Sequence, residues 1–355
     1  MKNLEVAINP GATVFPYSEA RQYLFRVLSE RLPPDLQKFA ETLVNLHLDE
    51  KNFPMPLDVD SEKMTDALRQ GASVSDLRKF ITFENTDSIS GICRVMVRTH
   101  LNRSGINYVS RGFAKKTKAK RVMGLFPVGF DPTPLVSWEG LTSAWLAFAT
   151  DEKHEHVKDE PGKALFSKVD IDSLKRLSEV KFVDLESLKK DSLIHNNWAR
   201  LLAGVHTGLK HLDDQYALDR TRVWEQIKEA STCADGVHQL IKKTSKSIVE
   251  YGPTLAGSFF ADLGGASFVK DDVHVRDSIA AFAGKTAGEV KGKYAFDVIQ
   301  KSAAHFKVTA RAIDKVMYLA CSGNFYLFDF KLEKPEAQKY KKQFICLLDT
   351  LRISP

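Results

Sequence analysis

The sequence predicts a mainly α-helical protein with a mixed α+β region at its N-terminal end. Residues 171–321 divide into short segments of helical apolar spacing, separated by polar or Gly/Pro-marked joints. Residues 122–137 instead combine Gly, Pro and aliphatic runs, which are typical of short strands and turns. The 355 residues are 43% hydrophobic and 27% charged, as in ordinary globular proteins. No window approaches about 18 consecutive apolar residues, so we expect no membrane span.

The N-terminal elements follow from apolar spacing and prolines. The spacing predicts a helix over 17–31, which Pro33 and Pro34 end. Ser61 offers a capped start for a later helix. The other elements expected before residue 150 are helices over 35–47, 61–82 and 138–149, and a strand or a helix over 91–102.

The second half of the chain predicts a compact domain of packed short helices. The polar stretch 151–163, which contains Pro161-Gly162, is the best linker. The expected helices are 171–178, 183–190, 193–209, 217–229, 234–248, 254–263, 272–283, 293–305 and 309–321. The expected organisation is a mixed region over 1–150, a linker with leading helices over 151–190, a helical domain over 191–330, and a tail or helix over 331–355.

The net charge of +6 is concentrated in one segment, residues 111–121. Its sequence RGFAKKTKAKR contains no acid and six bases: Arg111, Lys115, Lys116, Lys118, Lys120 and Arg121. Without them, the remaining 45 basic residues equal the 45 acidic ones. Such a segment is either a contact for a polyanion such as nucleic acid or a solvated surface loop.

Cysteine and histidine spacing predicts neither a metal site nor a cofactor. The four cysteines lie far apart in the sequence, which excludes a zinc ribbon or a clustered iron–sulfur site. His154 and His156 lie in an acidic loop without an obvious third or fourth ligand. Reduced thiols and an N-terminus without a long apolar stretch predict a cytoplasmic protein.

Residues 236–283 combine three features with a shared chemical use. A helix carrying Lys242, Lys243 and Lys246 is followed by a turn at 250–253 and a second helix. A glycine in such a turn lets backbone amides approach a phosphate, and the next helix N-terminus adds a positive dipole. Downstream, Asp271 and Asp272 precede a third helix. Either aspartate is an N-cap or a carboxylate that stabilises a cationic transition state or activates water.

This combination resembles the helix-hairpin-helix superfamily of DNA glycosylases, especially its 8-oxoguanine branches. The family hairpin reads Leu-Pro-Gly-x-Gly-x-Lys-x-Ala, and residues 248–256 lie on it. A Val-Asp-x-His-Val-like segment follows at nearly the same spacing as residues 269–275. Residues 305–320 resemble the closing helix of the family. The resemblance covers about residues 190–325 and implies that Asp272 is the catalytic aspartate and His274 the histidine that follows it.

The resemblance implies a glycosylase that flips a modified base out of double-stranded DNA and hydrolyses its glycosidic bond. Glu250 replaces the first hairpin glycine. Thr254 occupies the Schiff-base lysine position, which implies a monofunctional enzyme because a hydroxyl cannot form an imine. The expected DNA contacts are Gly252, Lys242, Lys243, Lys246, Thr254, Lys115, Lys116, Lys118, Lys120 and Arg121. The expected base pocket is His274, Tyr251 and Trp198.

Several alternatives stay open from the sequence. The substrate is either a damaged base, as in repair, or a bulky modified base of viral DNA, as in antiviral defence. One of the hairpin-helix lysines could instead supply lyase chemistry, although phosphate contact is the more ordinary role. The rival functions are a non-catalytic DNA-binding protein on the same scaffold and an unrelated all-α interaction protein. We expect a monomer in the cytoplasm, associated with the nucleoid.

Overall fold

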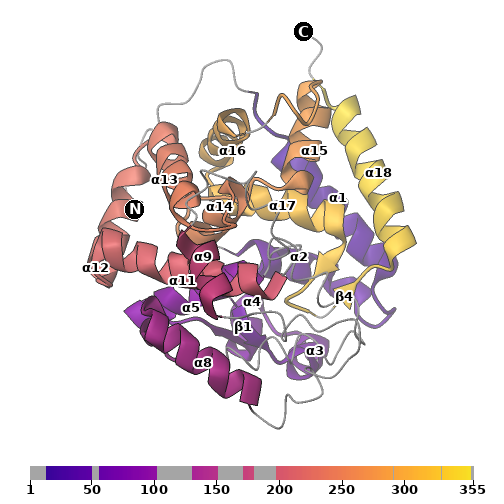
Figure 1. Cartoon of the computed structure of the whole chain (residues 1–355). Helices are drawn as coiled ribbons and strands as arrows, with labels where there is room; N and C mark the ends of the chain where they lie inside the picture. Colours follow the sequence, from indigo (N-terminus) through magenta and orange to yellow (C-terminus); the bar gives the residue numbers. More distant parts are fainter. Residues whose placement is uncertain are drawn as a thin grey trace. The chain divides into compact units, whose positions relative to one another are not determined.

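The computed structural model describes residues 13–49, 56–101, 130–150, 171–179, 197–290, 292–328 and 330–352. Helices dominate these residues, together with two short antiparallel strand pairs (Figure 1). The predicted mainly α class is therefore confirmed. None of the described helices is both long and apolar enough to cross a membrane.

The chain forms two compact units that alternate along the sequence. Unit 1 comprises 1–84, 227–240 and 260–355, and unit 2 comprises 85–226 and 241–259. Each unit is therefore assembled from stretches that are distant in the sequence. The organisation expected over 1–150, 151–190, 191–330 and 331–355 stays a prediction.

The N-terminal part of unit 1 begins with the predicted helix. Helix α1 (Tyr17–Arg31) ends before Leu32, which is extended as residues before a proline usually are. A 3₁₀ turn, η1 (Gln37–Phe39), leads into α2 (Ala40–Leu48), close to the predicted 35–47. The buried side of α1 includes Ala20, Leu24, Val27 and Leu28, so the apolar spacing identified its packed face.

The prediction of one helix over 61–82 is wrong. Helix α3 (Ser61–Arg69) is followed by Gly71 at φ +83°, a conformation that favours glycine and ends the helix. The segment continues as α4 (Val74–Leu77), the 3₁₀ turn η3 (Arg78–Phe80) and strand β2 (Ile81–Phe83), which pairs antiparallel with β1 (Pro56–Val59). The cap of α3 is Asp60 rather than Ser61, since the Asp60 side chain accepts from the Lys63 amide.

The C-terminal part of unit 1 packs around one helix. Its elements are α15 (Val273–Ala283), α16 (Lys293–Phe306), α17 (Ala310–Ser322), β3 (Asn324–Phe325), β4 (Phe330–Lys331) and α18 (Lys334–Thr350). Helix α17 contacts α1, α2, α15, α16 and α18 (Figure 1). The Tyr23 hydroxyl donates to the Tyr340 carbonyl at 2.6 Å, so α1 is tied to the C-terminal helix.

Unit 2 is built around a long helix, α11 (Asn197–Tyr216), which contacts α5 (Ile89–Leu101), α8 (Trp138–Thr150), α9 (Ile171–Glu179) and the 3₁₀ turn η4 (Thr133–Val136). The ambiguous 91–102 segment is therefore helical as far as Leu101, its last described residue. A Cβ at Gly204 of α11 would lie 2.6 Å from the His100 ring of α5, so glycine is needed there.

The remaining helices are α12 (Arg220–Ala230), α13 (Ala234–Ser247) and α14 (Pro253–Asp262), close to their predicted ranges. The predicted helix 183–190 lies outside the described residues, as do residues 122–129 of the expected strand and turn region.

Candidate functional site

Asp272 is the N-cap of α15. Its backbone is extended, and its Oδ1 accepts hydrogen bonds from the amides of His274 at 2.8 Å and Val275 at 3.2 Å. The capping interpretation of this residue is thus confirmed. These bonds fix the carboxylate in one orientation, while 14% of the side chain remains exposed.

The neighbouring Asp271 has a different environment. Its carboxylate is paired on both oxygens with the Arg276 guanidinium, at 2.9 and 3.1 Å, and also accepts from the Gly292 amide. Only 4% of the residue is exposed. Asp271 therefore holds the loop before α15 in place and is less exposed than Asp272.

Two further groups surround Asp272. The Lys270 ammonium lies 4.0 Å from Asp272 Oδ2, and the Lys270 amide donates to Asp314 Oδ2 at 3.2 Å. Burial raises the pKa of Asp314; the Arg311 guanidinium opposes this rise, and the negative charge of Asp272 adds to it. Asp314 therefore connects the candidate site around Asp272 to helix α17, through the Lys270 amide and the charge of Asp272.

His274 is half-buried, and its ring packs edge-on against Tyr318 at 5.8 Å between centroids. Burial lowers the pKa of His274, although the Asp272 carboxylate opposes this shift. The imidazole is consequently favoured in its neutral form. His274 lies close to Asp272, as the sequence motif implies, and the Tyr318 ring packs against its imidazole.

The hairpin turn lies in unit 2, whereas Asp272 lies in unit 1. Glu250, at the hairpin position where the resemblance leads us to expect a glycine, adopts a left-handed backbone with φ +61°. This conformation costs a non-glycine residue roughly 1–2 kcal/mol. Arg200 holds the Glu250 carboxylate through Nε at 2.6 Å and Nη2 at 2.5 Å. The amide of Val249 also donates to Thr207 Oγ1 at 3.0 Å, which anchors the turn to α11.

Gly252 has no internal requirement for glycine. Its φ lies outside the left-handed region, and an added Cβ would meet nothing within 4 Å among the described residues. The residue is exposed just before α14. This part of the hairpin is therefore open to a backbone approach from outside the chain.

The other hairpin residues differ in accessibility. Lys242, Lys243 and Lys246 are exposed on α13, and Thr254 is half-buried in the first turn of α14. Tyr251 is fully buried, with its ring stacked on His100 at 4.6 Å. That ring is engaged inside unit 2, which does not favour the expected base contact.

Two sets of expected contacts have no described side chains. Trp198 lies in the first turn of α11, where only the backbone is described. The basic residues Lys115, Lys116, Lys118, Lys120 and Arg121 lie outside the described residues.

Sequence reasoning missed a cluster on α17. Arg311 pairs with Asp262 at 2.6 Å and with Asp314 at 3.0 Å, and Lys315 follows one turn later against Tyr326. The available signal was three charged residues, Arg311, Asp314 and Lys315, within five positions of a helix whose other residues are mostly apolar.

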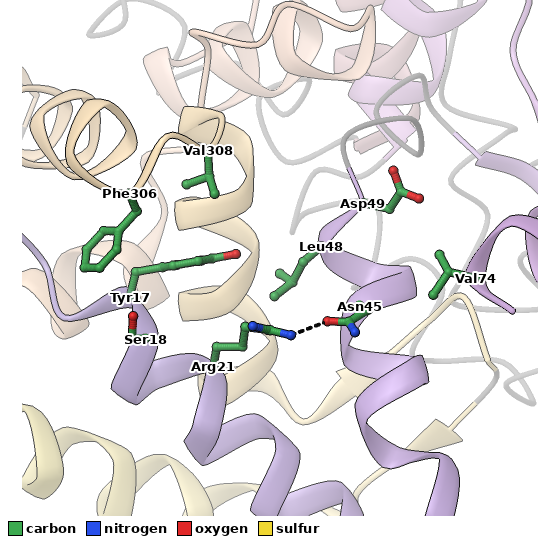
Figure 2. A pocket seen from close by; sticks show the side chains of 9 residues that line it. All are labelled: Tyr17, Ser18, Arg21, Asn45, Leu48, Asp49, Val74, Phe306 and Val308. Atoms are coloured by element: carbon green, nitrogen blue, oxygen red, sulfur yellow. Dashed lines mark hydrogen bonds between the residues drawn. The ribbon is translucent and has the colours of Figure 1, made fainter.

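Figure 2 shows a separate cavity of about 510 Å³ in unit 1, lined mainly by α1 and α2. Its guanidinium, Arg21, is already engaged by Asn45 Oδ1 at 2.7 Å and by Glu41 at 3.5 Å. None of the residues expected from the sequence lines this cavity. Within the described ranges, no three His, Cys, Asp or Glu side chains gather as metal ligands.

Comparisons with protein-family models, curated proteins and solved structures found no match to this chain.

Proposed function

We propose that this chain is a DNA glycosylase that excises a modified or damaged base, with Asp272 as its catalytic carboxylate. The observation that supports this most is the orientation of Asp272. Its Oδ1 is fixed by two amide hydrogen bonds, and the side chain keeps 14% exposure. A carboxylate held in this way meets a developing positive charge without reorganising.

In the proposed reaction, the glycosidic bond breaks and the base leaves with the bonding electrons. The deoxyribose becomes oxocarbenium-like, and the Asp272 carboxylate stabilises that positive charge. A water molecule then adds at the anomeric carbon, and the proton that it gives up goes to the released base, which leaves as the neutral free base. The proposal assigns no covalent role in base release to the hairpin, because Thr254 stands where a lysine would be needed.

The proposed duplex contact is the hairpin turn. Gly252 is exposed and is required neither by its φ nor by a described neighbour, so close approach of a phosphate would account for glycine there. Lys242, Lys243 and Lys246 are exposed on the preceding helix. Such contacts hold the DNA backbone without reading the sequence. In the same proposal, the basic segment 111–121 supplies a second phosphate contact.

The proposal covers two substrate classes, a damaged base of the host and a bulky modified base of viral DNA. Duplexes carrying each class are incubated with the protein and then treated with alkali, which breaks the strand wherever a base has been lost. Wild-type protein is expected to give breaks at one type of base. Asp272→Asn is expected to give none while retaining DNA binding.

Asp60→Asn is the matched control. Asp60 is also an N-cap aspartate of unit 1, and its side chain accepts from the Lys63 amide at 3.1 Å. This variant is expected to cleave like wild type. Equal loss of activity in both variants would trace the effect to helix capping and would remove Asp272 from the chemistry.

The second candidate function is a DNA-binding protein without catalysis. It is favoured by Glu250, since the Arg200–Glu250 ion pair places a carboxylate where the family has a glycine. This candidate predicts salt-dependent DNA affinity but no alkali-sensitive site with any substrate.

A further inference from the structure

Two neighbouring cavities of unit 1 share part of their walls. The cavity of about 510 Å³ in Figure 2 and a second one of about 400 Å³ are both lined by Tyr17, Ser18 and Arg21 of α1. The polar groups of Ser18 and Arg21 therefore border open space in both cavities.

Arg21 keeps hydrogen-bond donors that no described residue uses. Its Nη2 donates to Asn45 Oδ1 at 2.7 Å and lies 3.5 Å from Glu41 Oε1. Both contacts are made by this one nitrogen, so Nε and Nη1 have no hydrogen-bond partner within the described ranges. The Ser18 hydroxyl, one turn earlier, has none there either. Asn45 thus orients the guanidinium and leaves donors for a ligand.

The charges of the lining favour a ligand with a single negative charge. Asp49 lines the larger cavity, and its ion pair with Arg78 compensates its charge. Glu41 and Arg21 are 69% and 42% exposed, so their contact is weak because solvent screens it. The positive charge of Arg21 is consequently only partly compensated. A carboxylate matches it, whereas a phosphate would bring a charge of about −1.5 to −2 near two acidic side chains.

The larger cavity also has an apolar lining. The rings of Tyr17 and Phe306 pack at 5.5 Å between centroids, and the other apolar lining residues are Leu48, Val74 and Val308 (Figure 2). These side chains come from α1, α2, α4 and the junction of α16 with α17. The volume of about 510 Å³ lies within the range of about 300–1,000 Å³ that small-molecule sites occupy.

We propose that this cavity binds a small organic monocarboxylate with an aromatic or branched aliphatic body. The carboxylate accepts hydrogen bonds from Arg21 and Ser18, and the body packs against the apolar lining. Because the lining joins four segments of unit 1, binding stabilises that unit against unfolding. The site is independent of the proposed base excision, since Asp272 does not line this cavity.

Isothermal titration calorimetry of the full-length protein tests the ligand class. The probes are 2-naphthylacetate and 4-methylpentanoate, each beside its neutral amide, and 2-naphthyl phosphate. At least one acid is expected to bind with a Kd below about 1 mM, and its amide about tenfold more weakly or worse, because the amide lacks the charge. The phosphate is expected to bind more weakly than the carboxylates. These comparisons need no substitution in the protein.

Variants then locate the bound acid. Arg21→Met should weaken its binding about tenfold or more, because the charge-assisted hydrogen bonds are lost. Val74→Phe should weaken it as well, because the larger side chain fills the cavity while the donors stay in place. Glu41→Gln should tighten binding about twofold by removing a competing carboxylate. Arg26→Met is the matched control, since Arg26 is exposed on α1, lies over the Tyr23 ring and lines neither cavity.

Three outcomes of the probe titrations overturn the proposal: no binding by either acid, equal binding of acids and amides, or tighter binding of the phosphate. Unchanged affinity in both Arg21→Met and Val74→Phe also overturns it, because the acid would then bind elsewhere. Weaker binding in these two variants, with wild-type affinity in Arg26→Met, supports it. The alkali assay for base release is unaffected by any of these results, so the two proposals fail separately.

Discussion

Substitution of Asp272 separates its capping role from its proposed catalytic role. Asparagine can accept the same two amide hydrogen bonds that Oδ1 receives from His274 and Val275, at 2.8 and 3.2 Å. Asn and Asp are about equally good N-caps. Asp272→Asn therefore keeps both hydrogen bonds but loses the negative charge at the helix N-terminus, which contributes about 0.3–1 kcal/mol, and the 4.0 Å ion pair with Lys270. Asp272→Ala loses both hydrogen bonds as well, which costs about 1–2 kcal/mol.

The effect on turnover follows a different order. Both substitutions remove the carboxylate that faces the developing positive charge, and we expect each to slow base release by about 10²-fold or more. Urea unfolding gives the free energy of unfolding, and the alkali assay gives the rate. The predicted pattern is an asparagine variant nearly as stable as wild type and nearly as inactive as the alanine variant. If activity instead follows stability, so that Asp272→Asn stays active, the carboxylate acts only as a cap.

Four further predictions follow from the hairpin, the core and the basic segment. Gly252→Ala should leave stability unchanged or raise it by up to about 1 kcal/mol, yet weaken DNA binding; unchanged affinity in a gel-shift titration would contradict the phosphate contact. Arg200→Met should lower the free energy of unfolding by about 1–2 kcal/mol, because it removes the partner of Glu250. Glu250→Gly should lower it by less, because glycine also relieves the left-handed strain, and a larger loss for Glu250→Gly than for Arg200→Met in urea unfolding would refute this. Burial lowers the pKa of His47 to about 4, so the unfolded state binds an extra proton between about pH 6.5 and 4, and the free energy of unfolding falls as the pH drops through that range. His47→Gln should flatten this pH dependence, and an unchanged slope would exclude His47 as its source. Neutralising the bases of segment 111–121 should weaken binding to all sequences about equally and flatten the salt dependence, whereas unchanged affinity would make it a solvated loop.

Local signals determined most of the helices. The range of α1 was predicted residue for residue, because apolar spacing marks its buried face and two prolines follow its end. The predictions were wrong or left alternatives open where contacts with residues distant in the sequence determine the secondary structure. Strand β2 exists because Ile81 and Thr82 pair with β1, and helical spacing over 61–82 carries no trace of that partner. Residues 91–102 were ambiguous because their packing against α11 selects the helix.

The candidate site was predictable only in part, for the same reason. The sequence placed Asp272 at a helix start, and the helix boundary confirms that position. The residue pattern alone left Asp271 and Asp272 as alternatives, and only the family resemblance selected Asp272. The structural difference between the two aspartates depends on Arg276 and the Gly292 amide. No motif singled out Lys315, because its surroundings depend on residues distant in the sequence. Burial and the charge of Arg311 lower the pKa of Lys315, against the attraction of Asp262 and Asp314, and Asp262 lies 53 positions before Lys315 in the chain.

Mass spectrometry of free bases released from modified DNA tests the central claim most directly. Damaged host DNA and modified phage DNA are incubated separately with wild-type protein and with Asp272→Asn, and the small-molecule fraction is analysed. The account predicts that wild type releases one modified base as the intact free base, and that Asp272→Asn releases it at no more than about one hundredth of that rate. Absence of any free base with both DNA preparations, or equal release by the variant, would contradict the account.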